Sequence, residues 1–531
     1  MNKEMQRIIL ASVLIFLVLL LQPIYMKWLG FETDSLDEEL SAENYDETQR
    51  QLNDNNILQK TNPDLDSNVL QKTNPTLNIS NNSSVESINI TIESKLYNTI
   101  ISNRSGGTIL ESMMIERNND KYKYLASTAT DFNQPVVLRP FNNDSYCNPC
   151  IGYYDQNVKD YVYINAPFEL LTNINTSKPN IYINDLDSLQ LDFEYSNGNG
   201  LIINKTIIFY GNSYESKHIY QITNNTIANH NFELIWADGL SPIEKDRIDL
   251  DNGKAMIGQE GKTESLTIIE NSDNKKRIEY MGNTDWVSVR TKYFTAALLS
   301  KNNSDYSTMS GELRESSKNN NSAPLYNVSI GYDKYNQIIN ASMYLGPLDI
   351  DYISKLDSDL DKTINFGFWF LRPIGKFVLW FLKFIHNTFH LNYGICLIIF
   401  AAIIQIITSP LTKKTYKSSQ KMQEIQPLVK KIQEKYKDNP QKMNQEVMNI
   451  YKEKGVNPLG GCMPLLLQMP LLIAIFSVFR DTIEFRGAHF FLWISDLSQP
   501  DILFYLPEGW WIPLYGNHVA LLPIVMGVSI F

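Results

Sequence analysis

The feature that most constrains this chain is the stretch Leu391–Arg480, in which two apolar segments flank a basic one. The apolar segments, 393–412 and 458–480, are each long enough to cross a bilayer, because about 20 helical residues suffice. The intervening segment 413–455 carries 11 Lys against 5 acidic residues, a net charge of +6. Basic loops between spans stay in the cytoplasm, so the sequence predicts two transmembrane helices joined by a cytoplasmic hairpin.

The charge of the whole chain is divided unevenly. The net charge is −11, so the part outside the hairpin carries −17. Charge separated across apolar spans is typical of an integral membrane protein and argues against a nucleic-acid binder. The six His are scattered, and no Gly-rich phosphate loop occurs, so we expect no metal, no cofactor and no enzymatic activity.

The amino-terminal region predicts a membrane anchor followed by a tether. Lys3 and Arg7 precede an apolar run within residues 1–30. A cleaved signal peptide is the alternative, but no small-x-small cleavage site follows the run. Residues 31–84 are acidic and then rich in Asn, Ser and Thr, a composition that predicts a disordered linker.

Residues 85–355 show the alternation of short strands. Apolar and polar residues alternate at Ile88–Ile92 and at Leu191–Tyr195, between turns rich in Asn, Gly and Asp. This pattern predicts a large antiparallel β-sandwich. With Lys3 and Arg7 on the cytoplasmic side of the anchor, the sandwich is expected outside the cytoplasm. Its CxxC motif, Cys147–Cys150, has no second copy, which excludes a four-Cys zinc site. A structural disulfide or inert thiols is the favoured interpretation over a redox pair.

Residues 367–385 predict an amphipathic helix. Arg372, Lys376 and Lys383 fall on one side of a helical wheel. The opposite side is apolar and consists of Phe370, Ile374, Phe377, Phe381 and Ile385. We expect this helix to lie in the membrane interface as an anchor or lever; packing on the β domain is the alternative.

The first span carries a polar stripe. Helical spacing places Thr408, Ser409 and Thr412 on the same side as Gln405. Gln405 lies about 12 Å above the cytoplasmic end of the span, at 1.5 Å per residue. The polar groups either hydrogen-bond to neighbouring helices or to their own backbone near Pro410, or they line a hydrated groove open to the cytoplasm. The second span carries one amide, Gln468.

The basic hairpin predicts two amphipathic helices that turn at Asp438–Pro440 and end before Gly455. Its charge could attract anionic lipid headgroups or ribosomal RNA, or could simply be solvated. Four lysines represent this surface in our prediction: Lys413, Lys414, Lys430 and Lys431.

Several motifs closely resemble those of the bacterial YidC family of membrane protein insertases. They are Ser409–Thr412, Gly455–Cys462, Pro464–Pro470, Leu492–Leu497 and Leu522–Gly527. Tyr293-Phe294 and Tyr344–Pro347 resemble the periplasmic domain of the same family more loosely. The resemblance covers nearly the whole chain except the linker.

The resemblance implies a multi-pass protein of the bacterial inner membrane. It implies that hydrophobic segments of nascent membrane proteins enter the bilayer with this protein alone or with the Sec translocon, and that ribosome and lipid bilayer are partners. Gln405, Thr408, Ser409, Thr412 and Gln468 would line the groove, and Met469 and Pro470 would border the substrate path. No small-molecule substrate is expected.

Two departures from the family pattern stand out. The family usually has Arg where this chain has Gln405, and a neutral amide cannot attract an acidic client by charge. The family core has five spans, whereas residues 481–516 form a predicted periplasmic loop and 517–531 only begin a third span. We therefore expect a truncated chain that lacks the last two spans.

Two other functions remain open from the residues alone. A membrane-anchored periplasmic binding protein would use the β domain to capture a carbohydrate or lipid. A transporter subunit would show internal repeats among its spans, and none is found. The resemblance favours the insertase.

Overall fold

The computed structural model describes residues 85–530 apart from 119, 127–133, 141–146, 156–158, 175–178, 199, 225–230, 245–248, 250–251, 269–274, 316–321, 333–336, 357, 369, 438, 456–462, 491–493, 495, 500 and 507–517. The described residues belong to one unit of the chain, Asn74–Phe531. The predicted anchor at 1–30 and the predicted linker at 31–84 lie outside the described residues.

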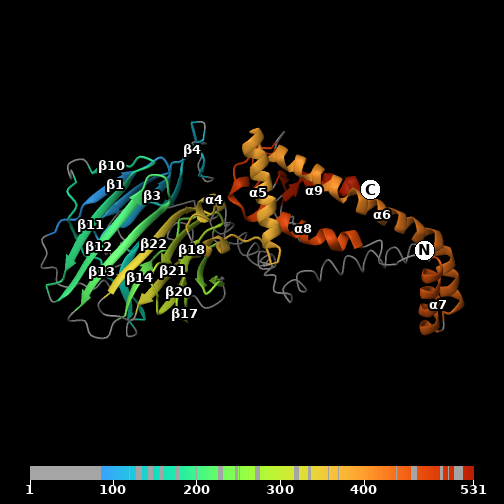
Figure 1. Cartoon of the computed structure of the whole chain (residues 1–531), viewed down its shortest axis with the longest axis horizontal. Helices are drawn as coiled ribbons and strands as arrows, with labels where there is room; N and C mark the ends of the chain where they lie inside the picture. Colours follow the sequence, from blue (N-terminus) through green and yellow to red (C-terminus); the bar gives the residue numbers. More distant parts are fainter. Residues whose placement is uncertain are drawn as a thin grey trace, which may run out of the picture. The chain divides into compact units, whose positions relative to one another are not determined.

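Three large sheets form the β-rich domain (Figure 1). The five-stranded sheet has the order β10 (Asn180–Tyr182), β1 (Asn89–Glu93), β2 (Tyr97–Ser102), β3 (Thr108–Met114), β6 (Val136–Arg139). The nine-stranded sheet has the order β16 (Lys262–Leu266), β15 (Lys254–Gln259), β18 (Trp286–Arg290), β19 (Phe294–Ser300), β22 (Gln337–Pro347), β13 (Glu215–Asn224), β12 (Leu201–Tyr210), β11 (Ser188–Ser196), β9 (Glu169–Leu170).

The remaining strands form a six-stranded sheet and two small ribbons. The six-stranded sheet has the order β17 (Lys275–Met281), β20 (Tyr306–Glu315), β21 (Ser322–Tyr332), β14 (Phe232–Trp236), β7 (Cys150–Asp155), β8 (Asp160–Tyr163). The ribbons pair β4 (Arg117–Asn118) with β5 (Lys121–Tyr122), and β23 (Ile502–Tyr505) with β24 (His518–Ala520).

The nine-stranded sheet packs against both other large sheets. Its strands β15 and β18 contact β20 and β21 of the six-stranded sheet. Near β11 and β12, Gly107, which directly precedes β3 of the five-stranded sheet, approaches Ile207 and Phe193 so closely that a Cβ there would lie 2.5 Å from the Ile207 side chain. Alternate residues of β12, such as Leu201 and Ile203, are fully buried, as expected for a strand whose two faces differ.

The β domain differs from the sequence prediction in one strand pair and agrees with it at the CxxC motif. The prediction that the sandwich is wholly antiparallel is wrong at one pair, because β1 and β10 run parallel. These strands are far apart in sequence, so a long connection can reverse the chain between them, and residue alternation does not reveal strand direction. Cys147 and Cys150 form a disulfide, and both are buried, in agreement with the structural interpretation.

The helical part begins directly after β22. It consists of α4 (Ile350–Ile353), η1 (Asp359–Thr363), α5 (Arg372–Phe389), α6 (Tyr393–Lys435), α7 (Pro440–Glu453), α8 (Met463–Asp481), η3 (Ile483–Phe485) and α9 (Leu521–Ile530). One hydrophobic core extends from the β domain into these helices and includes Val378, Leu382, Phe400 and Val478. The helices α5 and α8 therefore share a packed interior with the β domain.

The longest helix, α6, differs from the prediction. The span 393–412 and the start of the hairpin were expected to be separate, but α6 continues through Pro410 and Pro427 to Lys435. A proline removes one helix hydrogen bond without forcing the helix to end. Asn392 begins α6 by accepting a hydrogen bond from the Ile395 amide at 2.9 Å, and Asn439 caps α7 in the same way.

Among the described residues, one helix segment, Tyr393–Pro410, is long and apolar enough to cross a membrane. The second predicted span, 458–480, corresponds to α8, and its first residues lie outside the described part. The third predicted span corresponds to α9.

Lys205 on β12 is an unusual member of the β-domain core. Its side chain is 1% exposed, and its Nζ has one long hydrogen bond, 3.4 Å, to the Ser105 carbonyl. The amine lies 4.8 Å from the centre of the Tyr220 ring, and no carboxylate pairs with it in the described part of the chain. Burial therefore lowers the pKa of Lys205 well below its usual value.

We predict that Lys205→Met stabilises the β domain by about 1–3 kcal/mol, because it removes a buried amine whose hydrogen bonding is poor. The measurement is the thermal unfolding of the full chain followed by tryptophan fluorescence. The matched control is Lys217→Met on the adjacent strand, where the lysine is exposed. A lower unfolding temperature for Lys205→Met than for the control would contradict this prediction.

Candidate functional site

A hollow of about 510 Å³ lies along α6, and we call it the α6 hollow. Its lining residues recur at helical spacing on one face and are Gln405, Ser409, Thr412, Lys413, Tyr416, Lys417 and Gln420. Three of the predicted groove residues therefore meet at one site. The two lysines lie at one end of it, beyond the apolar segment Tyr393–Pro410.

The polar side chains of this face are not equivalent. The Thr408 hydroxyl donates to the Ile404 carbonyl at 2.8 Å, and the Thr412 hydroxyl donates to the Thr408 carbonyl at 3.1 Å. Both threonines thus bond to their own helix, which was one of the alternatives. The Gln405 side chain is exposed and makes no hydrogen bond within the described part of the chain. Within the apolar segment Tyr393–Pro410, the Gln405 amide therefore needs water or a bound group as its hydrogen-bond partner.

The apolar sides of α6 and α8 are also exposed. On α6, Ile406 and Ile407 are 72% and 64% exposed, next to the polar face. On α8, Met469 is 41% and Phe476 is 62% exposed. Unpartnered aliphatic and aromatic surface of this kind suits contact with lipid or with a hydrophobic segment.

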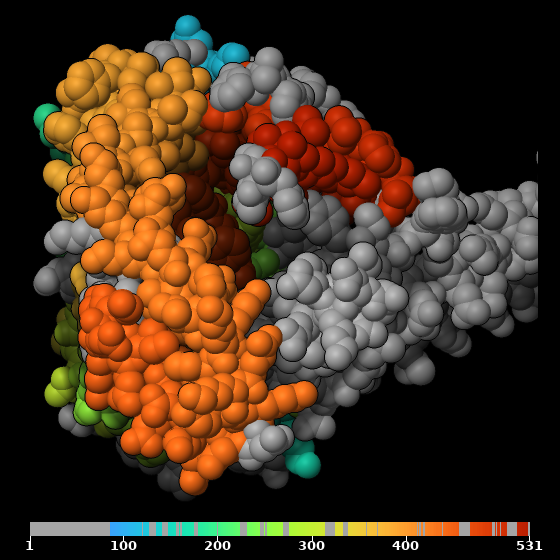
Figure 2. Space-filling model, turned by 90° about the vertical axis from the view of Figure 1, so that its right-hand side faces the viewer, coloured from blue at the N-terminus to red at the C-terminus, as the bar shows by residue number. Residues whose placement is uncertain are grey.

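The predicted residues of α8 lie apart from the α6 hollow. Gln468 and Pro470 are half-buried, and neither is among the residues that line the hollow. Helices α6 and α8 nevertheless contact each other. Figure 2 shows one face of the molecule, with the orange surface of α6 and α7 and the red surface of α9 on either side of a recess.

The hairpin lysines lie on the solvated side of α6. Lys413, Lys430 and Lys431 are exposed, and the side chain of Lys414 lies outside the described residues. On the other side of the same helix, Ile425 and Val429 are buried, 6% and 7% exposed, and α6 contacts α7 there. The amphipathic stripe predicted for the hairpin is thus the side on which its two helices meet.

The cations of α5 pair with the protein itself. Arg372 lies 3.0 Å from Asp361, and Lys376 also pairs with Asp361. Lys383 lies 3.0 Å from Asp349 and 3.1 Å from Glu484. The side predicted to face lipid headgroups therefore has carboxylate partners in this structure.

The exposed aromatic surface of α5 is rotated relative to the prediction. Phe377, Trp380 and Phe384 are 58%, 58% and 49% exposed. Ile385, predicted on the apolar outer side, is 4% exposed and belongs to the core. A helical wheel could not show this, because α5 is apolar on two sides and packs one of them against α8.

The comparisons with known proteins cover both parts of the chain. Residues 173–381 match the family described as YidC periplasmic domain, and residues 384–531 match the family described as 60Kd inner membrane protein. A protein named membrane protein insertase YidC from Prosthecochloris aestuarii is 36% identical over 450 residues, which are 83% of this chain and 73% of that protein.

The chain belongs to the YidC family of membrane protein insertases. The resemblance noted in the sequence is thereby confirmed. The family descriptions place YidC proteins in the inner membrane with a periplasmic domain.

Other YidC relatives match over a shorter range. One from Chloroherpeton thalassium is 38% identical over 379 residues, 68% of this chain and 62% of that protein. One from Chlorobium limicola is 40% identical over 61% of this chain and 55% of that protein. A galactose mutarotase related enzyme from Lactobacillus acidophilus is similar in structure over 49% of this chain and 97% of that one, at 11% identity. Its TM-score of 0.27 is too low to support a conclusion about the fold or function of this YidC chain.

The sequence analysis did not identify all the residues that line the α6 hollow of this YidC protein. Tyr416, Lys417 and Gln420 line the α6 hollow but were not assigned to it, because the span was expected to end at Thr412. Extending the helical spacing from Gln405 by 11, 12 and 15 residues would have found them. The carboxylates that meet the α5 cations carry no such signal, since they come from distant segments.

Proposed function

We propose that this chain is an insertase and chaperone that takes hydrophobic segments of nascent inner-membrane proteins into the bilayer. The α6 hollow receives the polar part of the client while its apolar segment moves along lipid-facing helices. The observation that carries the proposal is the α6 hollow itself, which joins Gln405 and Ser409 to Lys413 and Lys417 on one helix face. The names of the relatives support the same activity.

Hydration of the α6 hollow explains how such a helix could lower the barrier to insertion. A polar or charged group in hydrocarbon costs several kcal/mol when it finds neither water nor a partner. Gln405 lies about 12 Å along the helix from Lys413, at 1.5 Å per residue. If water follows this face, a client tail has only the remainder of a membrane about 30 Å thick to cross.

The charges at the end of the α6 hollow supply attraction that Gln405 cannot. Lys413 and Lys417 lie eight and twelve residues beyond Gln405 on the same face. Because α6 is one helix from Tyr393 to Lys435, these cations have a fixed place relative to Gln405. An acidic client tail would be drawn to the mouth of the hollow by charge and then held by neutral hydrogen-bonding groups.

The exposed side of α8 offers a path for the apolar segment. Met469 and Phe476 present adaptable apolar surface, and Gln468 and Pro470 flank Met469. The hairpin of α6 and α7 is the proposed contact for the ribosome, through Lys430 and Lys431. Cooperation with the Sec translocon and a multi-pass topology belong to the same proposal, and neither a cofactor nor a small-molecule substrate does.

We predict that Gln405→Leu lowers the insertion of a client with a short polar tail about five- to tenfold, because one hydrogen-bonding group worth about 1 kcal/mol is lost and the hollow becomes drier. The measurement is protease protection of the client in proteoliposomes that contain the purified protein. Gln405→Asn, which keeps the amide, and Ile406→Leu, next to the hollow, are the matched controls. Unchanged insertion by Gln405→Leu would remove this residue from the mechanism.

We predict that the double change Lys413→Gln and Lys417→Gln slows insertion of clients with acidic tails about two- to tenfold and leaves neutral tails unaffected, since exposed charges contribute up to about 1 kcal/mol each. The effect should diminish at high salt. The same assay serves, with Lys421→Gln and Lys435→Gln, both exposed and outside the hollow, as a charge-matched control on the distal part of α6. An equal loss for acidic and neutral tails would contradict the electrostatic role.

A further inference from the structure

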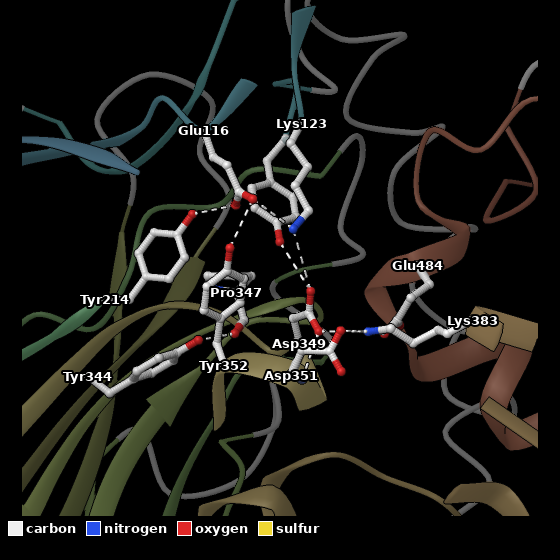
Figure 3. A network of polar contacts seen from close by, with 11 residues as sticks. Glu116, Lys123, Tyr214, Tyr344, Pro347, Asp349, Asp351, Tyr352, Lys383 and Glu484 are labelled. Carbon is white, nitrogen blue, oxygen red and sulfur yellow. Dashed lines mark hydrogen bonds and ion pairs between the residues drawn. The ribbon is translucent and has the colours of Figure 1, made fainter. Parts of the chain in front are cut away.

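Lys383 on α5 meets carboxylates from two other segments, the start of α4 and η3 (Figure 3). Its Nζ lies 3.0 Å from Asp349, 2.7 Å from Asp351 and 3.1 Å from Glu484. We call these four residues the Lys383 cluster. Asp349 caps α4 immediately after β22, and Glu484 lies in η3 immediately after α8. A single ammonium group thus joins the exit of the β domain, α5 and the end of α8.

The Lys383 cluster is largely removed from water. The side chain of Lys383 is 13% exposed, and those of Asp349 and Glu484 are 7% and 5% exposed. Burial raises the pKa of Glu484, and Lys383 is the nearby cation that opposes this. Burial also raises the pKa of Asp349, but Lys383 and Lys123 together outweigh it and lower that pKa. Loss of the Lys383 charge would leave Glu484 buried without its ion-pair partner.

A second layer of polar groups anchors the Lys383 cluster to the β domain. Lys123 lies 3.7 Å from Asp349 and 3.0 Å from Glu116. Glu116 accepts hydrogen bonds from the Tyr214 hydroxyl at 3.0 Å and from the Tyr352 hydroxyl at 2.9 Å. Figure 3 shows this chain of contacts running from the strands toward α5. Asp349 is therefore held from the β-domain side even without Lys383.

The segment after α8 is held on its other side by a second buried ion pair. Arg486 Nε lies 2.6 Å from Glu244, and the two side chains are 6% and 1% exposed. The Arg486 guanidinium also lies over the Phe294 ring of β19, 5.7 Å from its centre. Glu484 therefore pairs with Lys383 on α5, while Arg486, two residues later, pairs with Glu244 of the β domain.

We propose that Lys383 is a positioning residue that fixes the end of α8 against α5 and the β domain. Because η3 follows α8 with one residue between them, a fixed η3 fixes the helix that carries Met469. In this arrangement α5 is a bracket that connects the β domain to α8, in addition to any contact of its aromatic side with lipid. The part of this inference that concerns client insertion rests on the proposed function; the bracket itself does not.

Lys376 on the same helix provides a contrast. It is 43% exposed and pairs with Asp361, which Arg372 also contacts at 3.0 Å. Asp361 therefore keeps a cation when Lys376 is lost, whereas Glu484 loses its partner when Lys383 is lost. The two lysines lie on one helix but differ in what depends on them.

The test measures the distance between two spin labels in the full chain in lipid nanodiscs. The labels are attached at Phe476→Cys on α8 and Ile338→Cys on β22, both exposed positions. Cys396 and Cys462 are changed to serine, and this doubly labelled protein is the parent of the variants. We expect a narrow distribution with Lys383 and at least a twofold broader one in Lys383→Met, which keeps the side-chain length. Lys376→Met should match the parent. Adding Glu484→Gln to Lys383→Met should narrow the distribution again, because no buried charge then lacks its partner; a role in packing alone would not give this recovery.

A distribution in Lys383→Met as narrow as that of the parent would overturn the inference, as would equal broadening in Lys376→Met. Failure of the double variant to recover would also overturn it. An unchanged thermal unfolding midpoint of the β domain in all variants is the expected result and excludes unfolding as the cause. The distance measurement needs no client, so it tests the bracket independently of insertion. Insertion is tested separately, with the unsubstituted protein in proteoliposomes.

Discussion

Hydrocarbon offers no hydrogen bonds, so each polar side chain in the apolar segment of α6 needs a partner from the protein or from water. Thr408 and Thr412 satisfy their hydroxyls on carbonyls of their own helix. Gln405 has no such solution among the described residues, yet it lies within the apolar segment Tyr393–Pro410. The hollow that joins it to Lys413 and Lys417 gives water a route to its amide. The proposed insertion pathway depends on that route being wet.

Charge has two different roles in the helices. On α6, Lys413, Lys417, Lys430 and Lys431 are exposed and remain available to clients or other partners. The cations of α5 are already paired with Asp349, Asp361 and Glu484. The pairs that Lys383 makes with Asp349 and Glu484 are the buried ones. Such pairs contribute little net stability but make the loss of one partner costly, so they define position more than strength. The charge of Lys383 therefore fits a joint between the β domain, α5 and the end of α8.

The sequence predicted what depends on local pattern. Strand alternation indicated the β domain, and the spacing of Gln405, Ser409 and Thr412 brought three lining residues of the α6 hollow to one face. Asn439-Pro440 marked the turn before α7, because asparagine caps helices and proline fits their first turn. The parallel pair of β1 and β10 and the continuation of α6 through Pro410 depend on tertiary context and were missed.

What the sequence could not supply were partners from distant segments. The basic side of α5 was interpreted as facing lipid headgroups, because a helical wheel shows charges but not the carboxylates that meet them. Asp349, Asp361 and Glu484 lie up to about 100 positions from the lysine or arginine that each contacts. Gln468 was expected in the groove for a similar reason: one amide in an apolar span indicates a polar contact without showing where it is.

Photocrosslinking from position 405 to a stalled nascent membrane protein tests the central claim most directly. A photoreactive amino acid replaces Gln405 in one variant, Ile406 in a second and Met469 in a third, within otherwise identical membranes. Our account predicts that position 405 crosslinks to the polar tail of the client, that position 469 crosslinks to its apolar segment, and that position 406 crosslinks mainly to lipid. Absence of client crosslinks from both 405 and 469 would contradict it.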